Sequence, residues 1–196
     1  LLLGGLRVAL MRASFATLME QPKRHIEAMT QYGGEGLPWV GLGPFTDRPH
    51  MVQNVGDGSL FHSSYLNIRF CAAVGANITF KVLFNGSIAN TGAQDIVGAR
   101  TVPALTRLLA EEGVVRIAVV TKEPAQYSSA RMGERTTVHP VGEYARVVRE
   151  LADIRGVTLL TYDETCANER RRQQKRGVIP APNRFVVINE EVCENC

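Results

Sequence analysis

The chain has 196 residues, of which 45% are hydrophobic and 21% are charged. This composition suits one globular domain with a sizeable core and excludes a largely disordered polypeptide. A formal net charge of +3 is too small to indicate a nucleic-acid-binding protein by itself.

The first 50 residues show no regular alternation of strands and helices. We expect a helix near residues 14–31, followed by a glycine-rich stretch from Gly33 to Gly43. No apolar run reaches the ~18–20 residues that span a bilayer. The first residues also lack the order of a secretory signal, which is a basic start, an apolar stretch and a small-residue cleavage site. The chain begins with Leu1 and ends at Cys196, and we interpret both ends as cuts through a longer polypeptide.

From residue 51 onward, short apolar runs alternate with patterns of helical periodicity. Such alternation predicts right-handed crossovers and a mainly parallel sheet with helices on both faces, a three-layer αβα fold of the α/β class. The predicted strands cover residues 51–55, 78–84, 114–121, 157–162 and 184–189. The predicted helices cover residues 60–75, 102–109, 144–151 and 163–176, and residues 85–100 and 122–137 are predicted loops.

The expected domain organisation follows from this pattern. Residues 1–50 form an irregular N-terminal part of the domain, residues 51–189 form the α/β domain itself, and residues 190–196 begin another segment. In parallel sheets ligands bind at the carboxyl ends of the strands. The loops at 56–59 and 85–99, which leave two predicted strands, are therefore the candidate site.

The first of these loops reads Gly56-Asp57-Gly58-Ser59 and lies between a predicted strand and a predicted helix. Glycines let the backbone approach a phosphate, and the helix start offers unpaired N–H groups to an anion. The carboxylate of Asp57 suits a Mg²⁺ ion that bridges phosphate, and Asn85 ends the next strand with a second oxygen donor. The main-chain carbonyl of Ser87 is a third candidate ligand.

A Gly-Asp-Gly sequence taken alone is more often a tight turn than a ligand site. The arrangement of strand, Gly-Asp-Gly, helix, strand and Asn85 favours the site, because it brings both oxygen donors to one edge of the sheet. Spacing alone supports a metal-bridged diphosphate without identifying the molecule that carries it.

The same arrangement resembles the thiamine-diphosphate motif, in which Gly-Asp-Gly is followed some residues later by Asn. More blocks resemble the cofactor domain of 2-oxoacid:ferredoxin oxidoreductases, and indolepyruvate ferredoxin oxidoreductases in particular. They include the Gly-Asp-Gly segment through Ser63, Gly75–Thr79, Asn90–Gln94, Gln31–Gly36, Pro44–Thr46, Tyr162–Ala167, Arg170–Arg176 and Ile188–Glu190.

The resemblance implies an enzyme that oxidatively decarboxylates a 2-oxoacid, such as indolepyruvate or another arylpyruvate, to acyl-CoA and passes electrons to ferredoxin. It implies that Asp57, Asn85 and Ser87 hold Mg²⁺, and that Asn90, Thr91 and Gln94 face diphosphate and substrate. His62 is a further candidate for the cofactor site, although a histidine satisfied by backbone groups at a helix start is comparably plausible. Glu35 either contacts the cofactor or a neighbouring subunit, or it is only part of a plain turn.

In this family the glutamate that activates the aminopyrimidine ring belongs to a separate domain, so we assign no catalytic residue here. We expect a missing pyrimidine-binding domain or subunit, a dimer, and no activity from this chain alone. Two departures from the family pattern stand out. Ala93 replaces a usual glycine, and no Cys-Pro-rich segment is recognisable ahead of residue 30.

Cys193 and Cys196 form a Cys-x-x-Cys pair at the end of the chain. Two thiolates cannot complete a cluster, and taken alone the pair suits an incidental thiol pair or part of a zinc site equally well. The family resemblance shifts the interpretation to a truncated 4Fe–4S site. With only four cysteines in the chain, we expect a reduced, cytoplasmic protein rather than a disulfide scaffold.

The basic run at 170–176 is usually a solvated face, and a docking surface for acidic ferredoxin is the alternative. The run lacks interleaved aromatics and the whole chain is barely basic, so we expect no nucleic-acid partner. Because no apolar run is long enough to span a bilayer, we expect no membrane partner either. Two other functions stay open. One is a non-oxidative thiamine-dependent decarboxylase or synthase, and the other is a non-catalytic nucleotide-binding α/β module.

Overall fold

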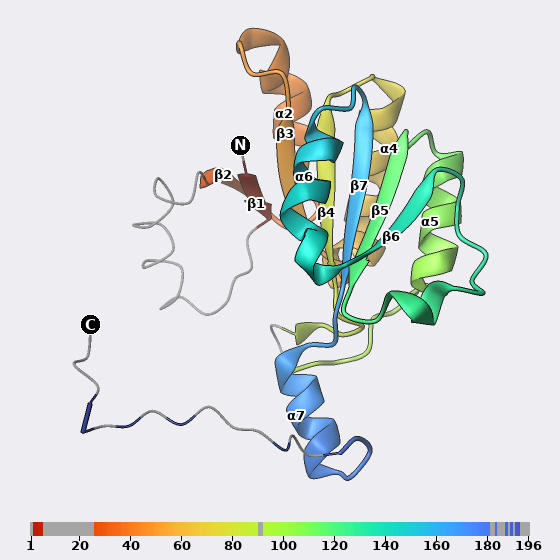
Figure 1. The fold of residues 1–196 in the computed structure, drawn as a ribbon. Helices are drawn as coiled ribbons and strands as arrows, with labels where there is room; N and C mark the ends of the chain where they lie inside the picture. Colours follow the sequence, from red (N-terminus) through yellow and green to blue (C-terminus); the bar gives the residue numbers. More distant parts are fainter. Residues whose placement is uncertain are drawn as a thin grey trace.

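A computed structural model describes residues 2–5, 26–89 and 92–180, together with residues 183, 187, 189, 191 and 192. Within this part, seven strands form one sheet in the order β2-β1-β3-β4-β7-β5-β6 (Figure 1). Every strand pair is parallel. The three-layer α/β fold expected from the sequence is therefore confirmed.

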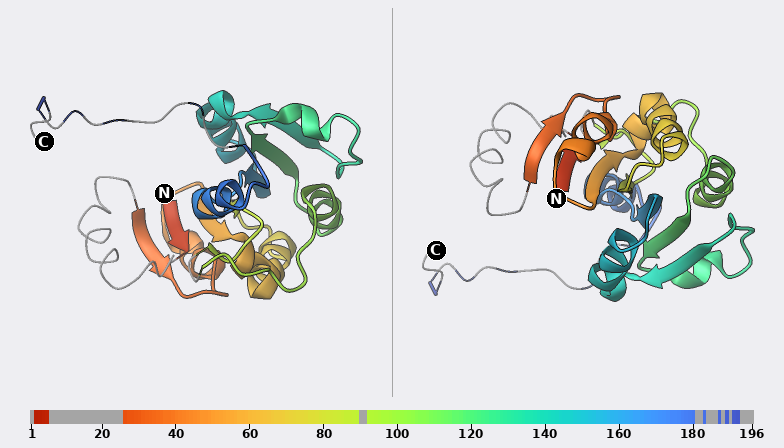
Figure 2. Two further views of the ribbon diagram at one scale, coloured as in Figure 1. Left: turned by 90° about the horizontal axis from the view of Figure 1, so that it is seen from below. Right: turned by 90° about the horizontal axis from the view of Figure 1, so that it is seen from above.

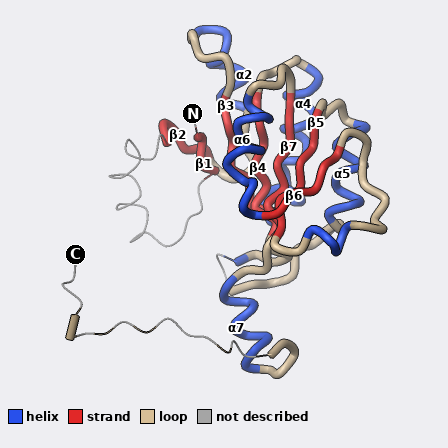
Figure 3. The backbone as a smooth tube through the Cα atoms, viewed as in Figure 1, coloured by secondary structure: helices blue, strands red, loops and turns tan. Residues whose placement is uncertain are grey.

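The elements follow one another in the order strand, helix, strand over most of the described chain (Figure 3). The strands are β1 (Leu2–Gly5), β2 (Ile26–Thr30), β3 (Met51–Gly56), β4 (Ile78–Phe84), β5 (Arg116–Thr121), β6 (Thr136–Pro140) and β7 (Val157–Asp163). The α-helices are α2 (Leu37–Leu42), α3 (Asp57–Ser59), α4 (Tyr65–Ala73), α5 (Val102–Glu111), α6 (Tyr144–Ala152) and α7 (Ala167–Lys175). The shorter turns are η2 (Gly43–Phe45), η3 (Leu60–Ser64), η5 (Pro124–Tyr127) and η6 (Val141–Glu143), of which η3 is a π-helix.

The direction of each crossover decides which face its helix covers. From β3 through β4 to β5 the chain moves one way along the sheet, whereas from β6 it returns to insert β7 between β4 and β5. Because parallel crossovers are right-handed, a reversal of direction places the connecting helix on the opposite face. Views along the strands accordingly show α6 on one side of the sheet and α4 and α5 on the other (Figure 2).

Each face has its own apolar core. The larger core contains Met51, Phe80 and Leu159 from the central strands, packed with Ile68 of α4 and Leu105 of α5. The smaller core, under α6, joins Val147 and Leu151 of that helix to strand residues of β5 and β7. The central strands are buried on both faces, as expected for a parallel sheet covered by helices.

Several boundaries agree closely with the sequence prediction. Helix α5 begins after Thr101, whose hydroxyl caps the helix by accepting from the backbone N–H of Ala104. The predicted helix at 60–75 starts earlier, at Asp57, and contains the unexpected π-turn η3. The predicted helix at 163–176 is shorter, because β7 extends to Asp163 and α7 begins at Ala167.

Two predictions of local structure were wrong. Residues 26–30 form strand β2 rather than the end of a helix, and the rest of the predicted helix at 14–31 lies mostly outside the described residues. The predicted loop at 122–137 runs into edge strand β6, whose five residues pair with β5. The predicted strand at 184–189 falls mainly on residues that are not described.

The carboxyl ends of β3, β4 and β7 point to the same edge of the sheet, where α7 projects below the body of the domain (Figure 1). From β1 the chain proceeds outward to β2, whereas from β3 it proceeds to β4 in the opposite direction. Such reversals of strand order lie beside ligand sites in open α/β sheets. Among the described helices, none is long and apolar enough to cross a membrane.

Candidate functional site

A cavity of about 370 Å³ opens at the carboxyl ends of β3 and β4. Most of the cofactor-binding residues expected from the sequence line it: Gly56, Asp57, Gly58, Ser59, His62, Asn85 and Ser87. The two loops selected from their positions after strands therefore meet in one hollow. The lining also includes Tyr32, Ile88 and Ala89, which the sequence did not assign to the site, and Glu35, for which a cofactor contact and a plain turn were both left open.

Asp57 is the first residue after β3 and only 2% exposed. Its Oδ2 accepts from the backbone N–H groups of Asn85 and Gly86, both at 2.7 Å, and its Oδ1 accepts from that of Gly58 at 2.9 Å. The carboxylate thus fixes the turn that follows β4. Both lone pairs of Oδ2 are occupied, and Oδ1 keeps one for a cation.

Burial raises the pKa of Asp57 from its ordinary value, and the three backbone N–H groups lower it in part. Desolvation disfavours the charged form of a carboxyl group, whereas donors and cations favour it. A divalent ion at the remaining lone pair of Oδ1 would therefore offset the desolvation cost of the ionised, ligand-free carboxylate.

Asn85 lies at the end of the neighbouring strand, as the sequence predicts, but its amide oxygen faces its own loop. Oδ1 accepts from the backbone N–H of Ser87 at 3.1 Å and from the Ser87 hydroxyl at 3.0 Å. Rotation of the hydroxyl would free one lone pair of the amide oxygen, because the position of its hydrogen is not fixed by the backbone. Asp57 and Asn85 can then each offer one oxygen to the same ion.

No lysine or arginine is among the described residues that line the cavity, whereas Asp57 and Glu35 both are. Two buried carboxylates would repel a bare diphosphate, so an anion needs a bridging cation as well as backbone N–H groups. Within the described residues, no group of three or more His, Cys, Asp or Glu side chains could hold a metal alone. The donor set thus fits a Mg²⁺ ion that takes its other ligands from phosphate and water.

Glu35 is the main residue that sequence reasoning left unresolved. It is only 1% exposed, in a turn ahead of α2, and its carboxylate accepts from the hydroxyls of Ser59 and Ser64 and from the backbone N–H of Gly33. The sequence left a turn and a cofactor contact open for Glu35. In the structure Glu35 ends a tight turn and also lines the cavity.

The loop after Asn85 closes on itself beside the cavity. Ile88 and Gln94 form an isolated antiparallel bridge, with the Ile88 N–H donating to the Gln94 carbonyl at 2.9 Å. Ala93, where the family pattern has glycine, has φ 64°, a left-handed conformation that costs an L-residue about 1–2 kcal/mol. The side chain of Arg172 on α7 donates to the carbonyl of Gly92 at 2.8 Å and ties α7 to this loop.

The remaining predicted site residues divide into three groups. His62 lines the cavity mouth, is exposed, and contacts the Ser63 hydroxyl at 3.1 Å. Gln94 is exposed and does not line the cavity. Four residues lie outside the described part of the chain: Asn90, Thr91, Cys193 and Cys196.

Known proteins with a related fold include the following two. The chain superimposes on a 2-oxoglutarate:ferredoxin oxidoreductase from Magnetococcus marinus, whose structure contains 2-oxoglutarate, coenzyme A and succinyl-CoA. The TM-score is 0.57, and the sequences are 15% identical over 73% of this chain. It also superimposes on a structure from Mycobacterium smegmatis assigned as a thiamin diphosphate-dependent enzyme, with a TM-score of 0.53 and 18% identity over 84% of this chain.

No protein-family profile and no curated sequence matches the chain. The superpositions cover 48% of the first structure's chain and 28% of the second's, so this chain spans less than half of either. At these identities the likeness shows a shared α/β fold.

Proposed function

We propose that this chain binds thiamine diphosphate with Mg²⁺ at the carboxyl ends of β3 and β4. The observation that carries the proposal is the meeting of Asp57 and Asn85 in one cavity beside the Gly-Asp-Gly helix start. The fold shared with two thiamine-diphosphate or 2-oxoacid enzymes supports the same function.

Each part of the site would have a defined task. Asp57 and Asn85 would hold Mg²⁺ through one oxygen each, with the Ser87 carbonyl as a third ligand, and the backbone N–H of Ser59 would face the diphosphate. Gly58 suits this approach, because a Cβ atom there would lie 3.5 Å from the Ile88 side chain and narrow the cavity. Bound thiamine diphosphate supplies the electron sink for decarboxylation of a 2-oxoacid.

We further propose that the complete enzyme oxidises a 2-oxoacid, with indolepyruvate or another arylpyruvate as the substrate, to acyl-CoA with transfer of electrons to ferredoxin. The ligands of the Magnetococcus neighbour support the 2-oxoacid and coenzyme A. Cys193 and Cys196 would then belong to a 4Fe–4S site completed elsewhere, and a partner domain or subunit would supply the pyrimidine-activating acid, within a dimer.

Isothermal titration calorimetry tests the proposed cofactor. We expect thiamine diphosphate to bind with Mg²⁺ and to lose this binding when EDTA removes the cation, while thiamine without its diphosphate binds far more weakly. Binding of ATP in preference to thiamine diphosphate would instead identify a nucleotide-binding module. No binding of thiamine diphosphate, even with co-purifying polypeptides present, would contradict the proposal. Ferredoxin reduction coupled to 2-oxoacid consumption would separate the oxidative from the non-oxidative reaction.

Helix α7 is the proposed docking surface for ferredoxin. None of its residues is buried, and Arg170 and Arg172 pair with Glu164 and Glu169 within the chain. Arg171 and Lys175 are exposed one helical turn apart and have no ion pair among the described residues. Together with the exposed Arg176 at the end of the helix, they are the cations of α7 most able to attract an acidic protein.

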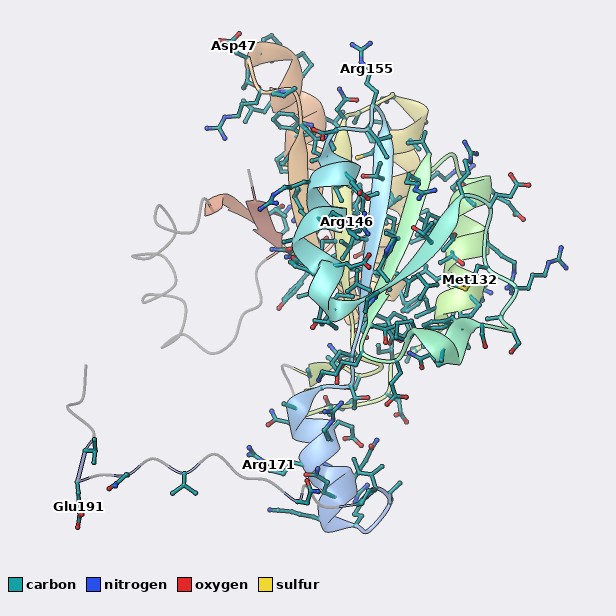
Figure 4. The ribbon with its side chains drawn as sticks, viewed as in Figure 1. Asp47, Met132, Arg146, Arg155, Arg171 and Glu191 are labelled. Atoms are coloured by element: carbon teal, nitrogen blue, oxygen red, sulfur yellow. The ribbon has the colours of Figure 1, made fainter. Side chains whose placement is uncertain are left out.

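Reversal of both charges, Arg171→Glu with Lys175→Glu, is expected to slow electron transfer to an acidic ferredoxin by about tenfold or more at low ionic strength. The dependence of the rate on salt should also flatten, because long-range attraction is what salt screens. Arg155→Glu is the matched control, since Arg155 is exposed at the opposite end of the domain (Figure 4). An unchanged salt dependence in the double variant would rule out docking on α7.

A further inference from the structure

Glu35 and the π-turn after Asp57 form one hydrogen-bonded unit beside the cavity. The Ser59 hydroxyl donates to Glu35 Oε1 at 2.5 Å, and the Ser64 hydroxyl donates to Oε2 at 2.6 Å. The backbone N–H of Gly33 donates to Oε2 at 2.8 Å. Among the described residues no cation pairs with this carboxylate, so its charge is balanced by three neutral donors.

The π-turn is what allows one carboxylate to reach both serines. With about 3.6 residues per turn, side chains five positions apart in an α-helix point about 140° away from each other. A π-turn contains more residues per turn and brings positions five apart toward the same side. In η3 the backbone N–H of Tyr65 donates to the carbonyl of Leu60, and the hydroxyls of Ser59 and Ser64 lie 3.0 Å apart.

The glycine turn that carries Glu35 is pressed against the same helical segment. A Cβ atom at Gly33 would lie 2.7 Å from the Ser63 hydroxyl oxygen. The side-chain amide of Asn67 donates to the carbonyls of Gly33 and Glu35 at 2.8 and 3.1 Å. The position of the carboxylate is therefore fixed independently of any ligand.

We infer that Glu35 is a positioning residue, whose carboxylate holds the π-turn at Ser59–Ser64 so that the backbone N–H of Ser59 is aimed at the diphosphate. The inference rests on the proposed function and adds a residue to it. The inference also restricts the role expected for Ser59. The Ser59 hydroxyl donates to Glu35, so the backbone N–H of Ser59 is the donor that remains for phosphate.

Glu35→Gln tests this inference with little change of shape. A glutamine amide has one acceptor oxygen in place of two, so it cannot accept from Ser59, Ser64 and Gly33 together. We expect the dissociation constants of Mg²⁺ with inorganic pyrophosphate, and of Mg²⁺ with thiamine diphosphate, to rise by about 10–100-fold, as for the loss of groups that orient metal ligands. Backbone amides at 58–64 should exchange hydrogen about tenfold faster in the ligand-free chain.

Glu112→Gln is the matched control. Glu112 accepts from the Tyr65 hydroxyl at 2.6 Å and pairs with Arg69 at 3.2 Å, so the same exchange removes a carboxylate that contacts the same helical segment without touching the cavity. If both variants lose similar thermal stability, only Glu35→Gln should weaken pyrophosphate binding. Equal affinity losses in the two variants would mean that Glu35 is merely structural and would overturn the inference.

Ser64→Ala separates the path through the serines from a direct effect of charge. Ser64 is fully buried and does not line the cavity, so it can act on pyrophosphate only through the hydrogen bonds that it shares with Glu35 and Ser59. We expect Ser64→Ala to weaken pyrophosphate binding, and the double variant with Glu35→Gln to bind no more weakly than Glu35→Gln alone. Fully additive losses would overturn the inference.

The outcomes also distinguish this inference from the proposed function. Wild-type binding of thiamine diphosphate with undiminished binding by Glu35→Gln would overturn the inference alone. If the wild type binds Mg²⁺ with pyrophosphate but not thiamine diphosphate, and Glu35→Gln weakens that binding, the inference stands and the proposed cofactor is wrong. Unchanged amide exchange at 58–64 in Glu35→Gln would overturn the inference whatever the cofactor.

Discussion

Asp57→Asn is expected to weaken Mg²⁺-dependent binding of thiamine diphosphate by at least about 100-fold while the domain stays folded. The substituted amide would keep one oxygen for the backbone N–H groups of Asn85 and Gly86, so the turn after β4 persists. What is lost is the negative charge beside the ion, in a cavity where no other described residue except Glu35 carries one. Hydrogen bonds and ion contacts of a charged group are the stronger ones.

The direction of the pKa shift explains why the fold should tolerate this change. Because burial raises the pKa of Asp57, the protonated side chain favours the folded state below the ordinary carboxyl pKa. This contribution is lost as the pH rises through the raised pKa, and above that pKa the folded chain holds an ionised carboxylate at a desolvation cost. Asparagine removes that cost and gives up about one hydrogen bond, worth about 1 kcal/mol.

Calorimetric titration with thiamine diphosphate and Mg²⁺, together with thermal unfolding, checks both halves of this prediction. Asp47→Asn is the control, because Asp47 is an exposed carboxylate at the end of the domain far from α7 (Figure 4). Wild-type affinity in Asp57→Asn would exclude Asp57 as a metal ligand. A large fall in the unfolding temperature would instead show that the carboxylate is mainly structural.

The pairing of Asp57 with Asn85 could be predicted from the sequence because both follow apolar runs. Strand periodicity placed each residue at a strand end, and parallel connections put neighbouring strand ends on one edge. The sequence did not predict how the oxygens are used. Asp57 accepts from the loop after β4, and Asn85 accepts from Ser87, and these contacts depend on backbone geometry that no spacing reveals.

The π-turn was missed, and the role of Glu35 was left open, for a related reason. A glutamate between glycines has no periodic pattern. Phe61, Tyr65 and Ile68 are spaced in the sequence as in an ordinary α-helix, so the π-turn at Leu60–Ser64 leaves no mark in the pattern of apolar residues. Edge strand β6 was missed because its residues are only partly buried, so the alternation that marks a strand is weak. Tertiary contacts decide all three features.

Gly36→Ala is expected to destabilise the fold by about 2–5 kcal/mol, the largest stability effect of a single methyl group near the site. Gly36 has φ 86°, a conformation that costs an L-residue about 1–2 kcal/mol. A Cβ atom there would also lie 2.4 Å from Cζ of Phe80, a fully buried ring in the larger core. Overpacking of this kind adds typically about 1–3 kcal/mol.

Thermal unfolding should show the midpoint of Gly36→Ala lower by about 4–20 °C, given about 2–4 °C per kcal/mol for a chain of this size. Gly75→Ala separates the two causes, because Gly75 has φ 67° but open space where its Cβ would stand. Equal losses in the two variants would show that Phe80 moves aside without cost. Gly36 lies in the same turn as Glu35, and its backbone N–H donates to the side chain of buried Gln53. Displacement of Gly36 should therefore also shift the carboxylate of Glu35. Gly36→Ala should therefore weaken pyrophosphate binding even at temperatures where the protein remains folded, whereas Gly75→Ala should not.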